Sequence, residues 1–216
     1  MQHAKNGVPA RSGEVVIEPI GLRGTLAVPE AAKAVVAFAH GSGSSRLSPR
    51  NRMVAGALQH AGFATLLFDL LTEPEAKNRG NVFDIGLLGE RLLAATDWLL
   101  DESSVKGLSI GYFGASTGAA AALVAASEHP GRLKAVVSRG GRPDLAGSAL
   151  PEVRVPTLLI VGGRDDVVLD LNRDAMAQMT CPTHLEIIPG ATHLFEEPGC
   201  LDQVVALTID WFARHV

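Results

Sequence analysis

The chain has 216 residues, of which 47% are hydrophobic and 19% are charged, and its formal net charge is -4. This length and balance are ordinary for a globular chain with a substantial core, so we expect one domain over residues 1–216. An acidic chain offers no basic face for a nucleic-acid backbone, which argues against a nucleic-acid partner. The first 13 residues hold no apolar signal core, and no later stretch is long enough to span a membrane. We therefore expect a cytoplasmic protein with no membrane contact.

Two β-rich segments open the chain, "EVVIEPI" and "LRGTLAVP", and Gly21 between them predicts two strands or a hairpin. Six short apolar runs follow, and such runs are typical of strands that are buried on both faces. They are "AVVAFAH" (34–40), "FATLLFDL" (63–70), "LSIGYFGA" (108–115), "LKAVVS" (133–138), "TLLIVGG" (157–163) and "THLEIIP" (from 183).

Helical patterns lie between these runs. Ser48 and Pro49 suit an N-cap and a first helical position, and a last helix should run from about residue 201 to the end of the chain. Three apolar faces have helical spacing: Met53, Val54, Ala57, Leu58 and Ala61; Leu88, Leu92, Ala95 and Leu99; Val204, Val205, Thr208 and Trp211. Strands that alternate with helices predict an α/β fold with a mostly parallel sheet, and ligands of such sheets bind at the carboxyl ends of the strands.

The stretch "GYFGASTGAA" carries the first chemical motif. Ser116 lies between Gly114 and Gly118, where a predicted strand meets a predicted helix. A serine on such a sharp turn needs small neighbours, because any Cβ two residues away would crowd the strand or the helix. The turn would expose the hydroxyl, which predicts a nucleophile; a capping serine in a glycine-rich turn is the alternative.

A nucleophilic serine needs a base and an acid that orients the base. His193, in the loop "PGATHLFEEPG", is the histidine best placed to be that base. Four of the others lie at termini or helix ends, namely His3, His60, His129 and His215. His184 lies within a strand, and His40 ends a strand beneath the loop "AHGSGSS". The loop "GGRDDVV" makes Asp165 the favoured acid, while Asp166 and Asp144 remain alternatives. All three groups follow the carboxyl ends of predicted strands, so they should meet at one edge of the sheet.

Acyl transfer also requires donors for a developing oxyanion. The loop "AHGSGSS" can provide the backbone N–H of Ser42, and the N–H of Thr117 should be the second donor. This loop lacks the Gly-Lys-Ser/Thr ending of a phosphate-binding loop, and His40 is expected to be structural. Cys181 and Cys200 show no metal-site spacing, so no metal and no cofactor is predicted.

Together, "HGSGSS", "GASTG", "GGRDDVV" and "GATHLF" resemble the α/β-hydrolase superfamily, and within it the dienelactone hydrolase-like group. The resemblance covers nearly the whole chain and implies about eight strands with helices on both faces and the triad Ser116, Asp165 and His193. Dienelactone hydrolase itself uses a cysteine nucleophile, whereas this chain has a serine. A serine carboxylesterase is therefore the expected activity, and the particular dienelactone substrate is not transferred.

Only residues 140–156 separate the two strands between which many relatives insert a helical lid, so we expect no lid domain. An open, shallow site for small or short-acyl esters follows from that expectation. Arg139 is a candidate substrate ligand because it ends a strand beside the predicted site, and Arg142 follows it closely. Three further arginines flank the predicted oxyanion loop: Arg46, Arg50 and Arg52. An anionic substrate is one interpretation, and arginines paired with acids such as Asp144 are the other.

The predicted reaction proceeds through an acyl-serine and needs only a small-molecule ester as partner; thioesters and lactones suit the same apparatus. A non-enzymatic ligand-binding protein with the same fold is the alternative function. A dinucleotide-binding turn fits poorly, because the glycine spacing of "GYFGASTGAA" is not G-x-G-x-x-G and the next strand ends in Ser138-Arg139 rather than in an acid.

Overall fold

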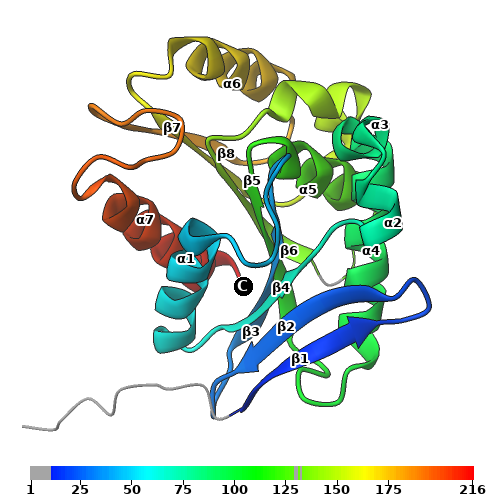
Figure 1. Ribbon diagram of the computed structural model, residues 1–216. Coiled ribbons are helices and arrows are strands. Elements are labelled where there is room, and N and C mark those ends of the chain that lie inside the picture. Colours follow the sequence, from blue (N-terminus) through cyan, green and yellow to red (C-terminus); the bar gives the residue numbers. More distant parts are fainter. Residues whose placement is uncertain (1–10, 129–130, 132) are drawn as a thin grey trace, which may run out of the picture.

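The computed structural model describes residues 11–128, 131 and 133–216. Within these residues eight strands form one sheet in the order β1-β2-β4-β3-β5-β6-β7-β8 (Figure 1). The strands are β1 (Arg11–Ile17), β2 (Leu22–Val28), β3 (Ala34–Ala39), β4 (Ala64–Phe68), β5 (Ser109–Ala115), β6 (Leu133–Arg139), β7 (Thr157–Gly162) and β8 (Thr183–Ile188). The residues numbered 1–10, on which the expected absence of a signal segment rests, lie outside this description.

The direction of the strands determines where a site can form. β1 and β2 make the antiparallel hairpin expected at Gly21, and β2 also pairs antiparallel with β4. The neighbouring pairs from β4 through β3, β5, β6 and β7 to β8 are all parallel. The carboxyl ends of β3 to β8 therefore reach the same edge of the sheet, as the sequence predicts.

Helices cover both faces of the sheet (Figure 1). They are α1 (Pro49–His60), α2 (Glu73–Ala76), α3 (Arg79–Phe83), α4 (Ile85–Asp101), α5 (Thr117–Glu128), α6 (Asp166–Gln178) and α7 (Cys200–His215), with a 3-10 segment η1 (Pro143–Glu152). Side chains of α1 and α7 pack in one core cluster, and those of α4, α5 and η1 pack in the other. In β3, Val36 and Phe38 point to the first cluster and Val35 and Ala37 to the second, which explains the uninterrupted apolar run.

Helix α1 begins as predicted but presents a different face. Ser48 is the N-cap and its side chain accepts a hydrogen bond from the Asn51 N–H, while Pro49 is the first helical residue. Met53, expected in the buried face, is 46% exposed. The buried face consists of Asn51, Val54, Ala55 and Leu58. The polar Asn51 is buried because it meets Arg139 of β6, a contact that hydrophobic periodicity cannot predict.

The connection between β4 and α4 contains two short helices that the sequence reading does not resolve. Thr72 and Glu75 form a capping box at the start of α2, and Asn78 caps α3. Arg91 of α4 pairs with Glu75 and so ties α2 to the longer helix. The interval 140–156 holds only η1, so the prediction of no lid domain there agrees with the structure. No helix in the described part of the chain has the length and apolar character to cross a membrane.

Candidate active site

The turn between β5 and α5 has the strained geometry that the glycine pattern predicts. Ser116 has a backbone φ of 51°, which is uncommon for a residue other than glycine. A Cβ on Gly118 would lie 2.2 Å from the carbonyl oxygen of Ala39, and one on Gly114 would lie 2.5 Å from the Cα of Ala119. Both positions therefore accept only glycine, because β3, β5 and α5 approach each other at the level of their backbones.

Backbone hydrogen bonds hold Ser116 in this conformation. Its N–H donates to the carbonyl of Arg139 at 3.3 Å, and its carbonyl accepts from the N–H groups of Arg142 and Ala119, each at 3.1 Å. The end of β6 and the segment that follows it thus hold the turn in place through these hydrogen bonds. A strained residue persists when its surroundings over-determine it, and such residues cluster at functional sites.

The two loops after β7 and β8 bring an acid and an imidazole together. Asp165 Oδ2 lies 2.7 Å from His193 Nδ1, and the side chains are 17% and 39% exposed. Because a carboxylate can only accept, Nδ1 carries the proton and the Nε2 lone pair is left available. Asp165 holds the N-cap position of α6 but makes no side-chain cap bond, so its carboxylate is free to face the ring.

The other two candidate acids lie elsewhere. Asp166 is the first residue of α6 rather than its cap. Asp144 receives two hydrogen bonds from Arg142, both of 2.8 Å. Of the three carboxylates weighed from the sequence, Asp165 is the one that contacts His193. His3 and His129 lie outside the described residues.

The histidine loop is fixed at both of its ends. A Cβ on Gly162 of β7 would lie 2.4 Å from the carbonyl oxygen of Ala191, so the loop passes directly over the strand that carries the acid. Phe195 is buried in the core with a φ of 57°. Thr192 donates from its N–H at 3.1 Å and from its hydroxyl at 2.6 Å to Glu197, and the hydroxyl bond lowers the pKa of that carboxyl.

Ser116 and His193 both lie against the segment of residues 139–140. A Cβ on Gly140 would be 3.6 Å from His193 Nδ1, while its neighbour Arg139 accepts the Ser116 N–H. No hydrogen bond joins the Ser116 hydroxyl to the imidazole among the described residues. Catalytic hydrogen bonds of this kind are often long in unliganded enzymes and shorten when a substrate binds.

The loop after β3 lies directly on the turn that carries Ser116. A Cβ on Gly41 would lie 2.9 Å from Ser116 Cβ, so glycine is required for this close approach. The Ser42 N–H donates to the Thr117 side-chain oxygen at 2.8 Å. The two residues predicted as oxyanion donors are therefore in contact with each other.

His40 holds this loop in place through hydrogen bonds that involve both ring nitrogens. Its Nε2 accepts the Leu70 N–H at 3.1 Å, so Nδ1 carries the proton and donates to the Gly41 carbonyl at 3.0 Å. Burial lowers the pKa of His40 and favours the neutral ring. With both ring nitrogens in use, His40 holds the loop to the end of β4, as expected of a structural residue.

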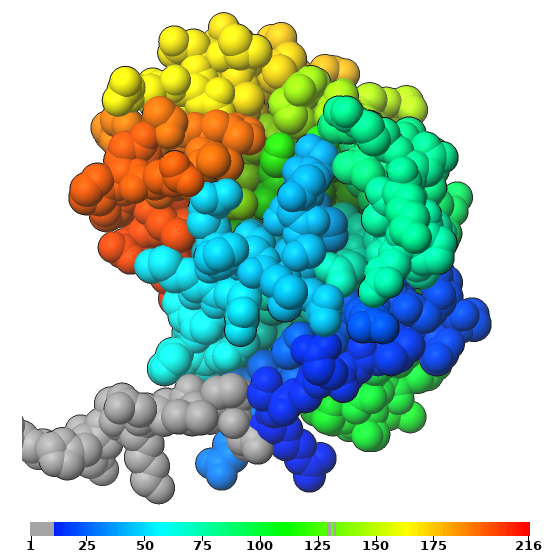
Figure 2. Space-filling view, viewed as in Figure 1, coloured from blue at the N-terminus to red at the C-terminus, as the bar shows by residue number. Residues whose placement is uncertain are grey.

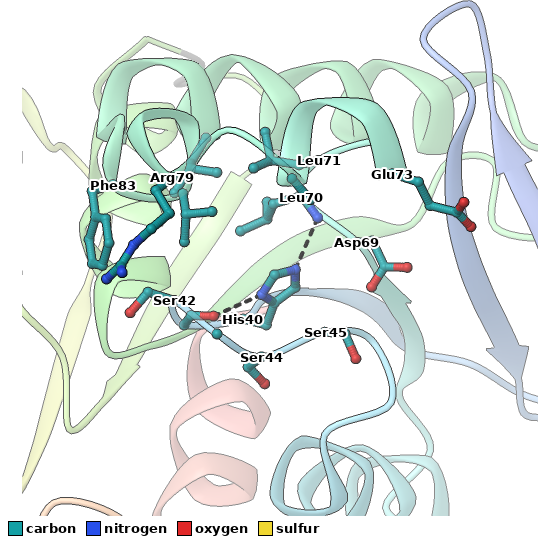
Figure 3. A pocket seen from close by; sticks show the side chains of 15 residues that line it. His40, Ser42, Ser44, Ser45, Asp69, Leu70, Leu71, Glu73, Arg79 and Phe83 are labelled. Carbon is teal, nitrogen blue, oxygen red and sulfur yellow. Dashed lines mark hydrogen bonds between the residues drawn. The ribbon is translucent and has the colours of Figure 1, made fainter.

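A cavity of about 670 Å³ adjoins the loop after β3. Its walls are the 41–45 segment and the α2–α3 segment (residues 73–83), and Figure 2 shows the hollow between the sky-blue 40s and the teal-green chain beyond residue 70. The apolar lining consists of Leu70, Leu71, Ala76, Val82, Phe83 and Leu88. Arg79 and Phe83 extend side by side towards Ser42 (Figure 3). The site thus has a wall that we did not expect from the sequence.

Arg139 lies apart from this cavity. Its side chain is in the core, 7% exposed, and reaches Asn51 of α1 at 3.4 Å. Burial, and secondarily the Arg50 charge, lowers its pKa to about 10. The structure does not bring this predicted substrate ligand to the site. Three of the other arginines near the loop are paired with acids: Arg46 with Asp69, Arg50 with Glu196 and Arg142 with Asp144.

Arg79 is the lining residue that sequence reasoning missed. It follows a polar stretch between two predicted elements, and nothing in the local pattern separates it from a solvated surface arginine. Its place in the cavity depends on how α3 folds back over the 41–45 loop. In the described part of the chain, no group of three or more His, Cys, Asp or Glu side chains is placed to share a metal ion.

Comparisons with known proteins agree with this fold. A solved dienelactone hydrolase from Anabaena variabilis shares 53% sequence identity, superposes with a TM-score of 0.92, and is matched over 98% of this chain and 100% of its own. Est1E from Butyrivibrio proteoclasticus superposes with a TM-score of 0.77 over 94% of this chain and 98% of its own, and at 16% identity this likeness concerns the fold alone.

The curated relatives are longer proteins. One from Mycobacterium tuberculosis, named as a phosphoribosyl transferase, is 59% identical over 203 residues, which are 94% of this chain and 46% of that protein. The chain thus spans about half the length of these relatives. The dienelactone hydrolase family matches residues 22–208 of the chain. Because this match extends over most of the chain, the chain belongs to the dienelactone hydrolase family.

Proposed function

We propose that the protein is a serine hydrolase that cleaves carboxylic esters through an acyl-enzyme on Ser116. The observation that carries the proposal is the strained Ser116 at the same sheet edge as the hydrogen-bonded Asp165 and His193. A positive φ at a serine between two obligatory glycines has a cost in stability, and an exposed nucleophile is a function that explains it.

In the proposed reaction His193 Nε2 takes the Ser116 proton as Oγ attacks the ester carbonyl. The carbonyl carbon becomes tetrahedral, its oxygen takes the negative charge, and Asp165 stabilises the imidazolium. The C–O bond to the alcohol then breaks, and His193 returns the proton to the departing alkoxide. Water, deprotonated by His193, attacks the acyl carbon, the bond from that carbon to Ser116 Oγ breaks, and His193 returns the proton to Oγ as the acid leaves. These residues complete the cycle without a metal or an organic cofactor.

The 670 Å³ cavity supports a substrate with a bulky apolar group. Its wall shares Gly41 and Ser42 with the surroundings of Ser116, so a substrate at the nucleophile can extend into it. Aryl or medium-chain esters fit this space better than the small esters expected from the sequence. Lactones and thioesters are compatible with the same reaction, and we propose a cytoplasmic location.

The test is labelling with a fluorophosphonate, which reacts with activated serines without requiring the substrate to be known. Peptide mapping should place one label per chain on Ser116, and Ser116→Ala should abolish it. Ser44→Ala, which changes a serine that lines the adjoining cavity, should label like the wild type. The ester hydrolysis rate should fall with the label in Ser116→Ala.

A well-folded wild type that is neither labelled nor active on an ester panel would contradict this proposal. It would favour the alternative of a ligand-binding protein, because the cavity would then serve binding alone. The phosphoribosyl transferase name belongs to relatives of which this chain matches 46%, and no feature of the cavity favours that chemistry here.

A further inference from the structure

We propose that the side-chain hydroxyl of Thr117 is an oxyanion donor in its own right. The inference rests on the proposed function and adds a catalytic group to it. Sequence reasoning assigned Thr117 a role through its backbone N–H alone, together with the N–H of Ser42.

The geometry of the loop after β3 changes that assignment. The Ser42 N–H points at Thr117 Oγ1 over 2.8 Å. A backbone N–H has a single hydrogen, and one that is directed at a hydroxyl is not fully directed at a substrate oxygen. In this arrangement one of the two expected donors is already engaged.

The hydroxyl that engages it keeps a proton of its own. A threonine hydroxyl has one hydrogen and two lone pairs, and accepting from Ser42 uses one lone pair. No acceptor for the Thr117 hydroxyl proton is found among the described residues. Thr117 is only 6% exposed, and a buried hydroxyl with an unused proton gains by donating to a ligand.

Thr117 is also in the right place. It follows Ser116 directly, at the first turn of α5, where backbone N–H groups have no acceptor within the helix. Gly41 comes so close to this turn that its Cβ position is 3.7 Å from Ser116 Oγ. In the proposed arrangement the Thr117 N–H and hydroxyl both face the carbonyl oxygen of an attacked ester as it becomes negative.

The three groups form a chain of hydrogen bonds. The Ser42 N–H donates to Thr117 Oγ1, and Thr117 donates its hydroxyl proton to the developing oxyanion. Acceptance of the first bond polarises the hydroxyl and strengthens the second. In this arrangement Ser42 acts as a positioning residue, and the proton stays on Thr117 throughout, so no bond is made or broken there.

Thr117→Val and Thr117→Ser test the inference on the full chain. Loss of one oxyanion donor typically lowers kcat by about 10²–10³-fold, so Thr117→Val should fall by this factor with KM within about twofold, and Thr117→Ser should recover most of the rate. Thr208→Val is the matched control, since Thr208 is a buried threonine whose hydroxyl bonds within α7. It should retain the wild-type rate.

The ratio of the rates on an oxoester and its thionoester distinguishes two roles of the Thr117 hydroxyl. It either donates to the oxyanion or only holds the loop after β3 in place. Sulfur accepts hydrogen bonds poorly, so loss of a donor should reduce the oxoester rate far more than the thionoester rate. A Thr117→Val rate within about threefold of wild type, or above it, would show that the released Ser42 N–H is the donor. An equal fall on both esters would likewise overturn the proposal.

These outcomes differ from failure of the proposed function. If Ser116 in the wild type takes the fluorophosphonate label and turns over esters, a normal Thr117→Val rejects only the hydroxyl donor. If the wild type is unlabelled and inactive, the acyl-enzyme itself is rejected.

Discussion

At the scale of single residues, the local sequence provides several candidates for one role, and contact distances in the structure decide between them. Asp165 and Asp166 are neighbours in one loop, and both could reach an imidazole in a reading of the sequence alone. The start of α6 distinguishes them. Asp165 takes the N-cap position, and its Oδ2 lies 2.7 Å from His193 Nδ1, whereas Asp166 is the first residue of the helix.

This difference leads to a prediction for substitutions that remove the charge but preserve the shape. Asp165→Asn should lower kcat by about 10²–10⁴-fold, because the amide no longer holds the productive tautomer of His193 or stabilises its charged form. Asp166→Asn and Asp144→Asn should stay within about threefold of wild type. Steady-state kinetics on one ester would measure all three, and an equal loss in Asp166→Asn would contradict the assignment of the acid.

At the scale of elements, the α2–α3 segment determines the shape of the site. From the sequence, the interval between β6 and β7 is too short for a lid domain, and we therefore expected an open, shallow site. The cover comes from the connection between β4 and α4, where Thr72 and Asn78 cap two short helices that fold over the 41–45 loop. Helices of four and five residues carry too little periodicity to be recognised in a sequence.

Phe83 of α3 should act as a specificity determinant of this cavity. Phe83 is 54% exposed and lines the cavity, where its ring can contact an apolar group of a bound ester. Phe83→Ala should reduce the preference for an aryl ester over the matching acetate or methyl ester by about tenfold, because the aromatic contact is lost. The measurement is the ratio of kcat/KM for the aryl ester to kcat/KM for the small ester, in one series that varies the acyl group and one that varies the alcohol.

Val167→Ala provides a control for that comparison, since Val167 is an exposed apolar residue of α6 that does not line the cavity. Its selectivity should equal that of the wild type. A Phe83→Ala variant that loses activity equally on large and small esters would show that Phe83 supports the fold rather than the substrate.

At the scale of the whole molecule, His40 links the active-site edge to global stability. Burial lowers its pKa below the ordinary value of 6.5, so the unfolded chain binds the proton more readily than the folded one. The stabilising contribution of neutral His40 is therefore complete above about pH 6.5 and is lost as the pH falls towards the lowered pKa. Protonation at Nε2 would also replace the acceptor that the Leu70 N–H requires.

We expect the free energy of unfolding in urea to decrease between pH 7 and pH 5, and His40→Asn to flatten that slope whatever its stability at pH 7. His215 is the matched control, because burial also lowers its pKa but His215 is less deeply buried than His40. His215→Asn should keep most of the slope. The carboxylates with lowered pKa, such as Glu14 and Glu75, act at a lower pH, around and below 4.5. Identical slopes for wild type and His40→Asn would refute this assignment.

The sequence by itself determined the order of the strands and longer helices along the chain, the parallel sheet and the candidate loops. Short apolar runs and glycines report local requirements, and Gly114 and Gly118 could be recognised because backbones leave no room for a Cβ there. Parallel connections then bring every loop that follows β3 to β8 to one edge, so the order of motifs along the chain predicts a common site.

Only the tertiary structure decided which candidates meet. The Asp165–His193 contact, the burial of Arg139 against Asn51, the cover formed by α3 and the bond between Ser42 and Thr117 each join residues that are 28 to 88 positions apart or depend on how a short helix folds back. Such contacts depend on packing differences of an ångström or less. Residue type and periodicity do not encode differences of that size, whereas the packed sheet and its helices do.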